Sequence, residues 1–406
     1  MKPTQTQNNM LGSVDPSQFS LVLGGPLYKL LVRSHLATPA FDLIRRRIIV
    51  ITLFAWLPLL LLSMAAGKAW AGGGLPFLYD IGIHARFLLA LPLLIGAELL
   101  VHMRLRLVVA QFVERNIISE TVLPRFKAAI ASALKLRNSV VIEVILLILI
   151  FVGGYFLWNT ANTIANIETS TGSWGVTATN GARHPSPAGY WFLFVSRPLF
   201  QFILIRWYFR LFIWTRFLWQ CSRLELNLIP THPDRAAGLG FLAMSCSAFA
   251  PLLLAHGALL MGLIANPIFF GGMKLTNFMM EILGVVVFLL LIVPGPLLVF
   301  SPRLMQAKRI GLRDYGILAS KYVRDFDLKW VRGAATADEP LLGSGDIQSL
   351  ADMGNSFQVV RDIGPFPFGK DMIIQLIVLT LLPVAPLILT MIPLEELIKR
   401  IVGSVF

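Results

Sequence analysis

The sequence predicts an all-α fold, a polytopic transmembrane helical bundle of about seven spans with long helices projecting into the cytoplasm. Hydrophobic residues make up 56% of the 406 residues and charged residues 14%, and the mean hydropathy of +0.72 far exceeds that of soluble domains. Apolar runs long enough to cross a bilayer recur along the chain. Basic residues cluster in alternate connections between these runs, which is the pattern of the positive-inside rule.

The formal net charge of +13 comes mainly from Lys and Arg that flank the apolar runs. We therefore expect anionic lipids, and no nucleic acid, as the partner of these charges. The two cysteines, Cys221 and Cys246, are too few for a disulfide framework or a thiol metal site. Walker A, G-x-S-x-G and G-x-G-x-x-G motifs are absent from the sequence. It predicts no catalytic residues, metal or cofactor, and does not favour an enzyme.

Residues 1–47 are predicted to form a cytoplasmic N-terminal segment, because Arg45-Arg46-Arg47 precedes the first apolar run. Within this segment, residues 19–36 are mildly amphipathic. They fit either a helix that lies on the membrane surface or a loosely packed connector.

A transmembrane bundle is predicted over residues 48–300. Its expected spans cover 48–66, 85–103, 139–158, 190–214, 241–264 and 278–300. Apolar residues at helical spacing continue past the second span, so residues 104–138 are predicted to form a helical hairpin that projects into the cytoplasm. The connection 159–189 is rich in Asn, Thr, Ser and Gly, and we expect it to face outward.

Residues 301–370 are predicted to form a second cytoplasmic helical region. An apolar stripe at i, i+3 and i+4 spacing marks its first helix: Leu312, Tyr315, Leu318, Tyr322, Phe326 and Trp330. Asp346 is expected to cap a second helix that reaches Asp362. Residues 371–406 are predicted to hold the last span and a short amphipathic tail.

Ionisable side chains fall inside the predicted spans, where an unpaired charge is costly. By depth they form an inner layer of Glu98, His102, Glu143, Arg206 and Arg210, and an outer layer of Arg197, His256 and Glu281. The layers fit structural ion pairs. They also fit a polar path on which arginines attract anions and Glu98, His102 or His256 passes protons. Glu98 and His102 share one helical face, but a catalytic zinc site needs three protein ligands, so no metal site is predicted.

A cytoplasmic loop after the fourth span contains His232, Pro233, Asp234, Arg235 and Gly238. Its His-Pro-Asp tripeptide is the one with which J-domain co-chaperones engage their chaperone partner, although the basic helix of those domains is missing here. Alternatively, the loop is a structural turn in which Asp234 caps a helix and glycine permits close approach. An ion- or ligand-contacting loop is the third interpretation.

The loop PTHPDRAAGLGFL and the segment DIQSLADMGNSFQVVRD near the end of the chain resemble a family of uncharacterised bacterial polytopic inner-membrane proteins. The resemblance covers most of the chain after the first span. It implies a location in the bacterial inner membrane and no particular activity.

Charged layers and proline-broken spans favour a channel or transporter for a small ion or solute, anion-preferring and assembled as a homo-oligomer. The alternative is a membrane-anchored signalling or scaffold protein whose cytoplasmic helices bind a protein partner. A channel predicts a continuous polar path through the bundle. A scaffold predicts a sealed bundle with an exposed apolar patch on the cytoplasmic helices.

Overall fold

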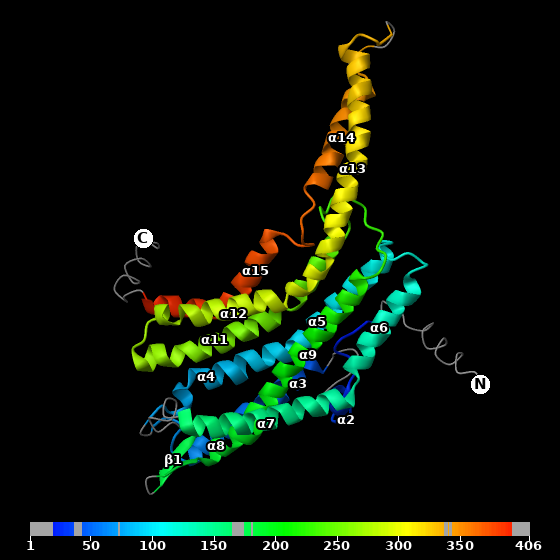
Figure 1. The fold of residues 1–406 in the computed structure, drawn as a ribbon. Coiled ribbons are helices and arrows are strands. Elements are labelled where there is room, and N and C mark those ends of the chain that lie inside the picture. The colour runs from blue at the N-terminus through cyan, green and yellow to red at the C-terminus, as the bar shows by residue number, and fades with distance from the viewer. Residues whose placement is uncertain are drawn as a thin grey trace, which may run out of the picture.

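A computed structural model describes residues 19–35, 43–71, 74–164, 174–179, 182–336, 340 and 343–391. Figure 1 shows a bundle of long helices and a helical hairpin that stands away from one end of it. The regular structure of the described residues is helical apart from one antiparallel pair of strands, β1 (Val176–Thr179) and β2 (Ala182–Pro185). The predicted amphipathic tail lies outside the described residues.

The bundle contains the candidate membrane spans. Five helices in the described chain are long and apolar enough to cross a membrane, or up to seven if each of two bent pairs is one span. The five are α3 (Ile44–Ala65), α4–α5 (Ile81–Glu114), α8–α9 (Pro187–Ser222), α11 (Ala250–Gly271) and η6–α12 (Leu275–Ile292). The bent pairs are α6 (Leu123–Arg137) with α7 (Val140–Ile164), and α15 (Lys370–Leu381) with η9 (Ala385–Met391). The all-helical class is confirmed, and these helices are compatible with a multi-pass membrane protein.

Two spanning helices contain a π-helical turn. These turns are η3 (Ala85–Ala90), between α4 (Ile81–His84) and α5 (Leu91–Glu114), and η4 (Phe192–Ser196), between α8 (Pro187–Trp191) and α9 (Arg197–Ser222). Each precedes a proline, Pro92 or Pro198, which has no amide hydrogen for the preceding turn, so that turn widens. The two π turns lie close together, with the rings of Phe87 and Phe192 6.4 Å apart.

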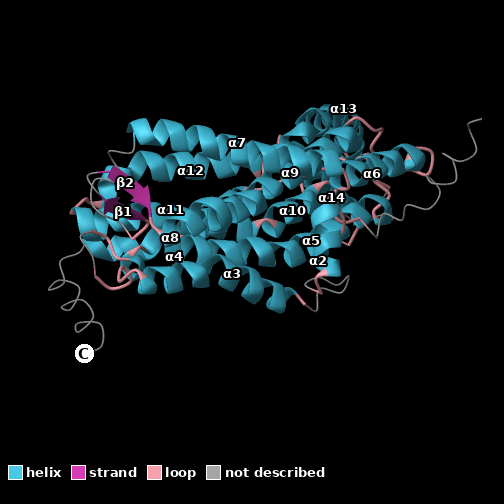
Figure 2. Cartoon of the chain, turned by 90° about the horizontal axis from the view of Figure 1, so that it is seen from below, coloured by secondary structure: helices cyan, strands magenta, loops and turns pink. Residues whose placement is uncertain are grey.

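The two longest helices reach beyond a bilayer. α4–α5 has 34 residues and α8–α9 has 36, which correspond to about 51 and 54 Å against a hydrocarbon core of about 30 Å. α6 lies along α9 (Figure 1), and Arg216 Nη1 donates a hydrogen bond to Ser132 Oγ at 2.7 Å. Figure 2 shows α3, α5, α9 and α7 side by side, with the β1–β2 pair at one end of the bundle.

The span predicted at residues 241–264 lies later in the sequence, at α11. After Gly240 the chain first forms the short elements η5 (Gly240–Leu242) and α10 (Ala243–Ala248). α11 begins with Pro251 in its first turn, a favoured helix start, and ends where Gly272 takes a φ of 66°. The Met273 N–H donates to the Pro267 carbonyl at 3.1 Å, so the left-handed glycine lets the chain turn back onto the last helical turn. The prediction followed the apolar run, whereas proline and glycine set the helix ends.

The segment before α2 (Pro26–Arg33) belongs to the bundle core, which neither sequence interpretation anticipated. Three of its side chains are at most 1% exposed: Phe19, Leu21 and Val22. The Phe19 ring lies 5.1 Å from the ring of Phe217 on α9. Arg137 Nη1 donates to the Ser20 carbonyl at 2.6 Å, and Gly24, with a φ of 140°, leaves room for this guanidinium.

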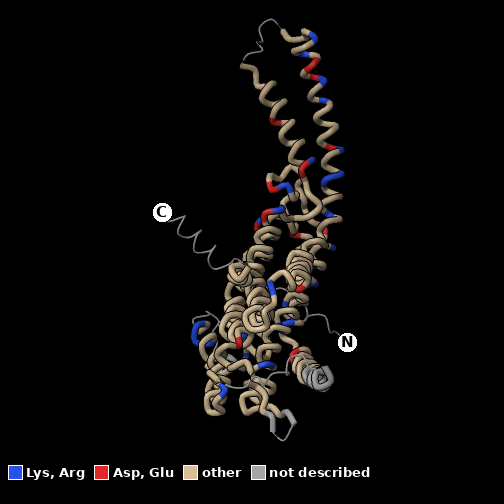
Figure 3. The backbone as a smooth tube through the Cα atoms, turned by 90° about the vertical axis from the view of Figure 1, so that its left-hand side faces the viewer, with Lys and Arg blue, Asp and Glu red and all other residues tan. Residues whose placement is uncertain are grey.

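The projecting hairpin is named the stalk here. It consists of α13 (Ser301–Phe326), its π-helical extension η8 (Asp327–Val331), and α14 (Gly345–Arg361). η7 (Gly295–Phe300) joins the stalk to α12 (Met279–Ile292), at the break predicted from Pro294-Gly295-Pro296. Figure 3 shows charged residues along the stalk and its base and few within the bundle.

Asp346 does not cap α14 as predicted, because Ser344 occupies the N-cap position. The Asp346 carboxylate instead accepts hydrogen bonds from Lys329 Nζ and Trp330 Nε1, each at 2.9 Å. These bonds lower the pKa of Asp346 below its ordinary value, with the Lys329 bond as the larger cause. The carboxylate therefore ties the start of α14 to η8.

Candidate functional site

Four helices bring five charged side chains together inside the bundle. Arg47 lies in the first turns of α3, Glu98 within α5, Glu143 in the first turn of α7, and Arg206 and Arg210 on α9. All five are buried, with exposed fractions of 3 to 9%. The i, i+4 spacing of the two α9 arginines puts both on one face of that helix. These residues are named the arginine–glutamate cluster.

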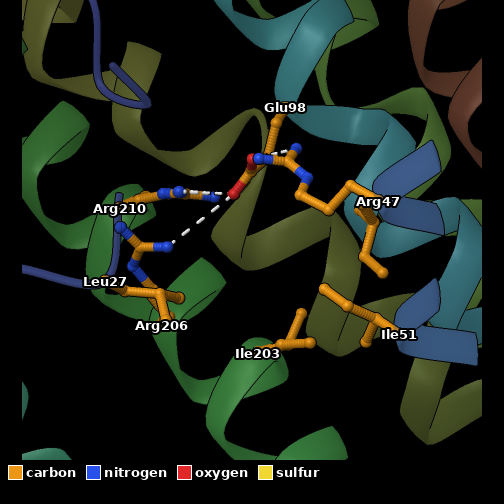
Figure 4. A pocket seen from close by; sticks show the side chains of 8 residues that line it. Leu27, Arg47, Ile51, Glu98, Ile203, Arg206 and Arg210 are labelled. Carbon is orange, nitrogen blue, oxygen red and sulfur yellow. Dashed lines mark hydrogen bonds and ion pairs between the residues drawn. The ribbon is translucent and has the colours of Figure 1, made fainter. Parts of the chain in front are cut away.

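Glu98 is the centre of the arginine–glutamate cluster (Figure 4). Its Oε1 accepts a hydrogen bond from Arg210 Nη2 at 2.7 Å and lies 3.8 Å from Arg206 Nη1, while its Oε2 pairs with Arg47 Nη2. Arg206 also pairs with Glu143, with 3.4 Å between Nε and Oε1. The predicted pairing between the inner-layer glutamates and arginines is therefore present, with Arg47 as a further member.

The N-terminal segment closes the cluster on one side. The Leu27 N–H donates to the second carboxylate oxygen of Glu143 at 2.9 Å, and the Gly25 N–H donates to Asn138 Oδ1 at 3.0 Å. Gly25 has a φ of 87°, a left-handed conformation that favours glycine. Its backbone approaches Glu143 so closely that a Cβ atom would lie 3.1 Å from Oε1.

A cavity of about 30 Å³ lies within the cluster. Its charged lining consists of Arg47, Glu98, Arg206 and Arg210, and the rest of its wall is aliphatic. Arg47 is 3% exposed, and its Nε has no hydrogen-bond partner among the described residues. A buried polar nitrogen without a partner is costly, and this nitrogen belongs to a residue that lines the cavity.

Charge is also unbalanced at the cluster. Three arginines face two glutamates, which leaves one positive charge in excess, and the salt bridges of the described residues bring no further carboxylate to these arginines. Arg210 is partly compensated by the Trp207 ring, whose centroid lies 4.6 Å from its guanidinium carbon. The indole nitrogen of Trp207 donates to the Leu94 carbonyl at 2.9 Å, which holds the ring in place.

The remaining inner-layer candidate, His102, lies outside the cluster. Its Nδ1 is 2.9 Å from Ser20 Oγ, in the buried N-terminal segment. Glu98 and His102 thus have different partners although they share a helical face. Among the described residues, no group of three His, Cys, Asp or Glu side chains is placed to hold a metal ion.

The three outer-layer candidates are not brought together. His256 is buried, with Nε2 2.6 Å from Tyr208 Oη and Nδ1 2.7 Å from the Leu252 carbonyl. A carbonyl only accepts, so Nδ1 carries the proton and Nε2 accepts from tyrosine. Arg197 precedes Tyr208 by eleven residues on α9, an axial separation of about 16 Å. Arg197 is half-buried and forms no salt bridge within the described part of the chain, and Glu281 is exposed on α12.

A polar cluster centred on Asp80 was missed by the sequence analysis. Asp80 Oδ2 accepts from Trp174 Nε1, and its Oδ1 accepts from Asn266 Nδ2, both at 2.9 Å. Asn266 Oδ1 in turn accepts from the Ile81 N–H at 3.0 Å. The cluster joins α4, α11 and the segment before β1. Asn266 carries no charge and falls between the predicted spans 241–264 and 278–300, so nothing in the sequence indicates this pairing.

The loop His232–Gly238 folds around the Asp234 carboxylate. Its Oδ1 accepts from the N–H groups of Ala236 at 2.9 Å and Gly238 at 3.1 Å, and its Oδ2 accepts from Gly240 at 2.8 Å. Partial burial raises the pKa of Asp234, but the three N–H donors together lower it by more than burial raises it. The pKa therefore lies below its ordinary value. His232 Nδ1 is 2.9 Å from the same Oδ1.

The Asp234 loop packs against the base of the stalk. Pro230 lies against Gly311 of α13, where a Cβ atom would be only 2.6 Å from the proline Cβ. Arg235, at a φ of 54°, accepts from the Gly364 N–H through its carbonyl at 3.3 Å, and its guanidinium lies 3.7 Å from Asp362. The three N–H groups that donate to the Asp234 carboxylate all lie within the next six residues of the chain. The geometry is therefore that of a structural turn at the junction of bundle and stalk.

No family model, curated protein or solved structure matches this chain in comparisons with known proteins.

Proposed function

We propose that this chain is a polytopic inner-membrane scaffold of a bacterium, with about seven spans, which binds a protein partner through its stalk. The observation that carries the proposal is the burial pattern of the stalk. Its buried residues lie at the base, at Leu304, Ala307, Gly311 and Val360. From residue 312 to 359, none of the described side chains is buried.

Large apolar side chains are exposed along the same length of the stalk. Ile317 is 66% exposed, Leu328 57% and Val331 68%. Two helices alone cannot enclose a core, so an isolated hairpin of this size gains little from burial. A partner that covers these side chains would supply the missing burial, since exposed apolar surface on a soluble element typically marks an interaction site.

The chemistry of the stalk favours an acidic amphipathic helix as the partner. On α13 and η8, Ile310, Ile317 and Leu328 recur at helical spacing, with Lys321 and Arg324 between the last two. Lys321 and Arg324 are exposed and form no salt bridge with any other described residue. Residues 301–332 carry eight Lys or Arg against three Asp. A second copy would bring basic residues against basic residues, so charge complementarity supports a different, acidic chain.

The side of the membrane follows from the positive-inside rule. The stalk, the α5–α6 connection and the start of α3 all carry clusters of Lys and Arg. We place these segments, and with them the N-terminus, in the cytoplasm. The basic residues nearest the spans would then contact anionic lipid headgroups.

A photo-crosslinking experiment tests the scaffold proposal. A photoreactive residue at Ile317 should give an adduct with another protein in native membranes, and the double change Lys321→Glu and Arg324→Glu should remove that adduct. The matched control places the same group at Asn355, an exposed polar position on α14, and should give none. An adduct with twice the 45.0 kDa mass of the chain would show that the crosslinked protein is a second copy of this chain and not a different partner. No adduct at Ile317 would contradict a docking role.

A channel or transporter for a small ion or solute is the second candidate. The excess positive charge of the arginine–glutamate cluster favours it, because arginines inside a bundle attract anions. Against it, Arg197, His256 and Glu281 do not continue the cluster into a polar path. Liposomes that contain the purified chain should show no anion flux if the scaffold proposal is right. A chloride flux that Arg206→Gln reduces would instead favour the channel.

A further inference from the structure

We propose that the cavity of the arginine–glutamate cluster binds one monovalent anion of halide size. The proposal concerns a site inside the bundle and does not depend on the scaffold function of the stalk. It rests on the charge of the cluster, the hydrogen-bonding state of Arg47, and the size of the cavity.

The charge of the cluster calls for one anion. Arg47, Arg206 and Arg210 are opposed by Glu98 and Glu143 alone among the described residues. The side chains of the three arginines are 4 to 8% exposed, so water screens the excess charge poorly. An uncompensated buried charge is strongly destabilising. One monovalent anion would bring the cluster to neutrality, whereas a water molecule would not.

The cavity also has an unused donor. Arg47 Nε is buried and has no partner among the described residues, although Nη2 of the same guanidinium pairs with Glu98. Arginine presents several N–H groups in one plane, so an anion beside Nε completes its hydrogen bonding. Figure 4 shows Arg47, Arg206 and Arg210 converging from α3 and α9 around Glu98.

The size of the cavity limits the chemical class of the ligand. Its volume of about 30 Å³ is room for about two water-sized particles. A bare halide ion fits this space and needs less room than sulfate, a phosphate headgroup or a carboxylate of another chain. The aliphatic part of the wall, including Ile51 and Ile203, suits a weakly hydrated monatomic anion and gives no donor for a larger oxyanion.

The test compares salts at equal ionic strength, using the purified full chain in lipid nanodiscs. Because a ligand that binds only the folded state raises the melting temperature, chloride and bromide should raise it in a saturable way relative to gluconate. Arg47→Gln, which balances the charges and removes Nε, should abolish this halide-dependent shift. The matched control is Arg46→Gln, an exposed neighbour on the same helix, which should retain the shift.

A second variant and a direct measurement complete the test. Ile51→Phe should fill the cavity without changing charge and should also abolish the shift, so the outcome does not depend on whether Arg47→Gln folds. Crystals grown in bromide should give an anomalous peak within hydrogen-bond distance of Arg47 Nε. Equal melting temperatures in all salts would overturn the proposal. So would an equal loss of the halide-dependent shift in Arg46→Gln and Arg47→Gln, or a water molecule in place of the bromide peak.

Discussion

Arg206 in the bundle and Ile317 in the stalk each occupy the environment expected of the other. The arginine is 6% exposed and the isoleucine 66% exposed. Arg206 lies among four helices that bring two carboxylates to it, so its charge is tolerated in the interior. Ile317 lies on a two-helix hairpin, where one face of each helix necessarily remains uncovered. The number of surrounding helices, rather than residue polarity, decides burial in both cases.

The proposed membrane location completes the environment of the bundle but not that of the stalk. In the bundle, most buried polar groups find partners within the chain, and the exposed apolar side chains of α3, α7 and α12 would face lipid. In the stalk, which carries many charges, exposed apolar side chains have no lipid to face. Predictions about the bundle therefore concern stability, and predictions about the stalk concern binding.

The largest effect is expected from Glu98→Gln. Removing this carboxylate leaves Arg47 and Arg210 without an anionic partner and should cost about 3 to 5 kcal/mol of unfolding free energy. Thermal melting in detergent measures the loss. The control is Glu114→Gln, an exposed position at the end of the same helix, which should change stability by less than about 0.5 kcal/mol. Equal melting of the two variants would mean that the bundle does not depend on its central pairing.

The next effect is expected from Gly257→Ala in α11. An added Cβ would lie 2.1 Å from the Thr380 carbonyl oxygen of α15, and backbone cannot move away without separating the helices. Overpacking of this kind typically costs about 1 to 3 kcal/mol, read as a lower melting temperature. Gly284→Ala in α12 meets open space and should be neutral or slightly stabilising. Similar losses at both glycines would contradict the described packing of α11 on α15.

A smaller effect is expected from Asp234→Ala at the junction of bundle and stalk. Three loop N–H groups lose their acceptor, at a cost of about 1 kcal/mol because water can replace the partly exposed carboxylate. The pKa of Asp234 is lowered in the folded state, so its contribution is present above the unfolded value of about 3.9 and is lost as pH falls through the folded pKa. Melting of wild type and variant should therefore differ at pH 7 and converge in acid. A difference that persists in acid would assign the effect to another cause.

The smallest effect is expected from Asp346→Asn at the tip of the stalk. The variant weakens the bonds to Lys329 and Trp330, so amide exchange should rise in the first turn of α14 and stay unchanged in the bundle. The pKa of Asp346 is lowered by these donors, so wild type should resemble the variant once pH falls below the folded pKa. Faster exchange in α5 would contradict the independence of the two parts.

The sequence predicts the class of this fold well and its contacts only in part. Composition and helical periodicity are local properties, so the all-helical class and the stripe on α13 could be read directly. Of that stripe only Leu318, at 47%, is exposed, while the other members are half-buried. Pairing of Glu98 and Glu143 with arginines of α9 follows from charge in a low-dielectric interior.

The contacts that escaped prediction depend on which helices become neighbours. Arg47 was interpreted only as part of a topology signal, because nothing local in Arg45-Arg46-Arg47 tells which arginine faces α5. Tyr208 was not considered as a partner of His256, since a phenol carries no charge at neutral pH. The buried segment around Phe19 contacts α6 and α9 through residues that lie more than a hundred positions away in the sequence.

Amide hydrogen exchange of α5 and α13, compared between native membranes and purified nanodiscs, tests the central claim most directly. The α5 segment around Glu98 should be equally protected in both preparations, because its neighbours belong to the chain itself. Residues 312–330 of α13 and η8 should be protected in native membranes and lose that protection on purification, since the partner is then absent. Ile317→Asp should remove the protection in native membranes as well. Equal exchange of α13 in both preparations would contradict a stalk that is covered by a partner.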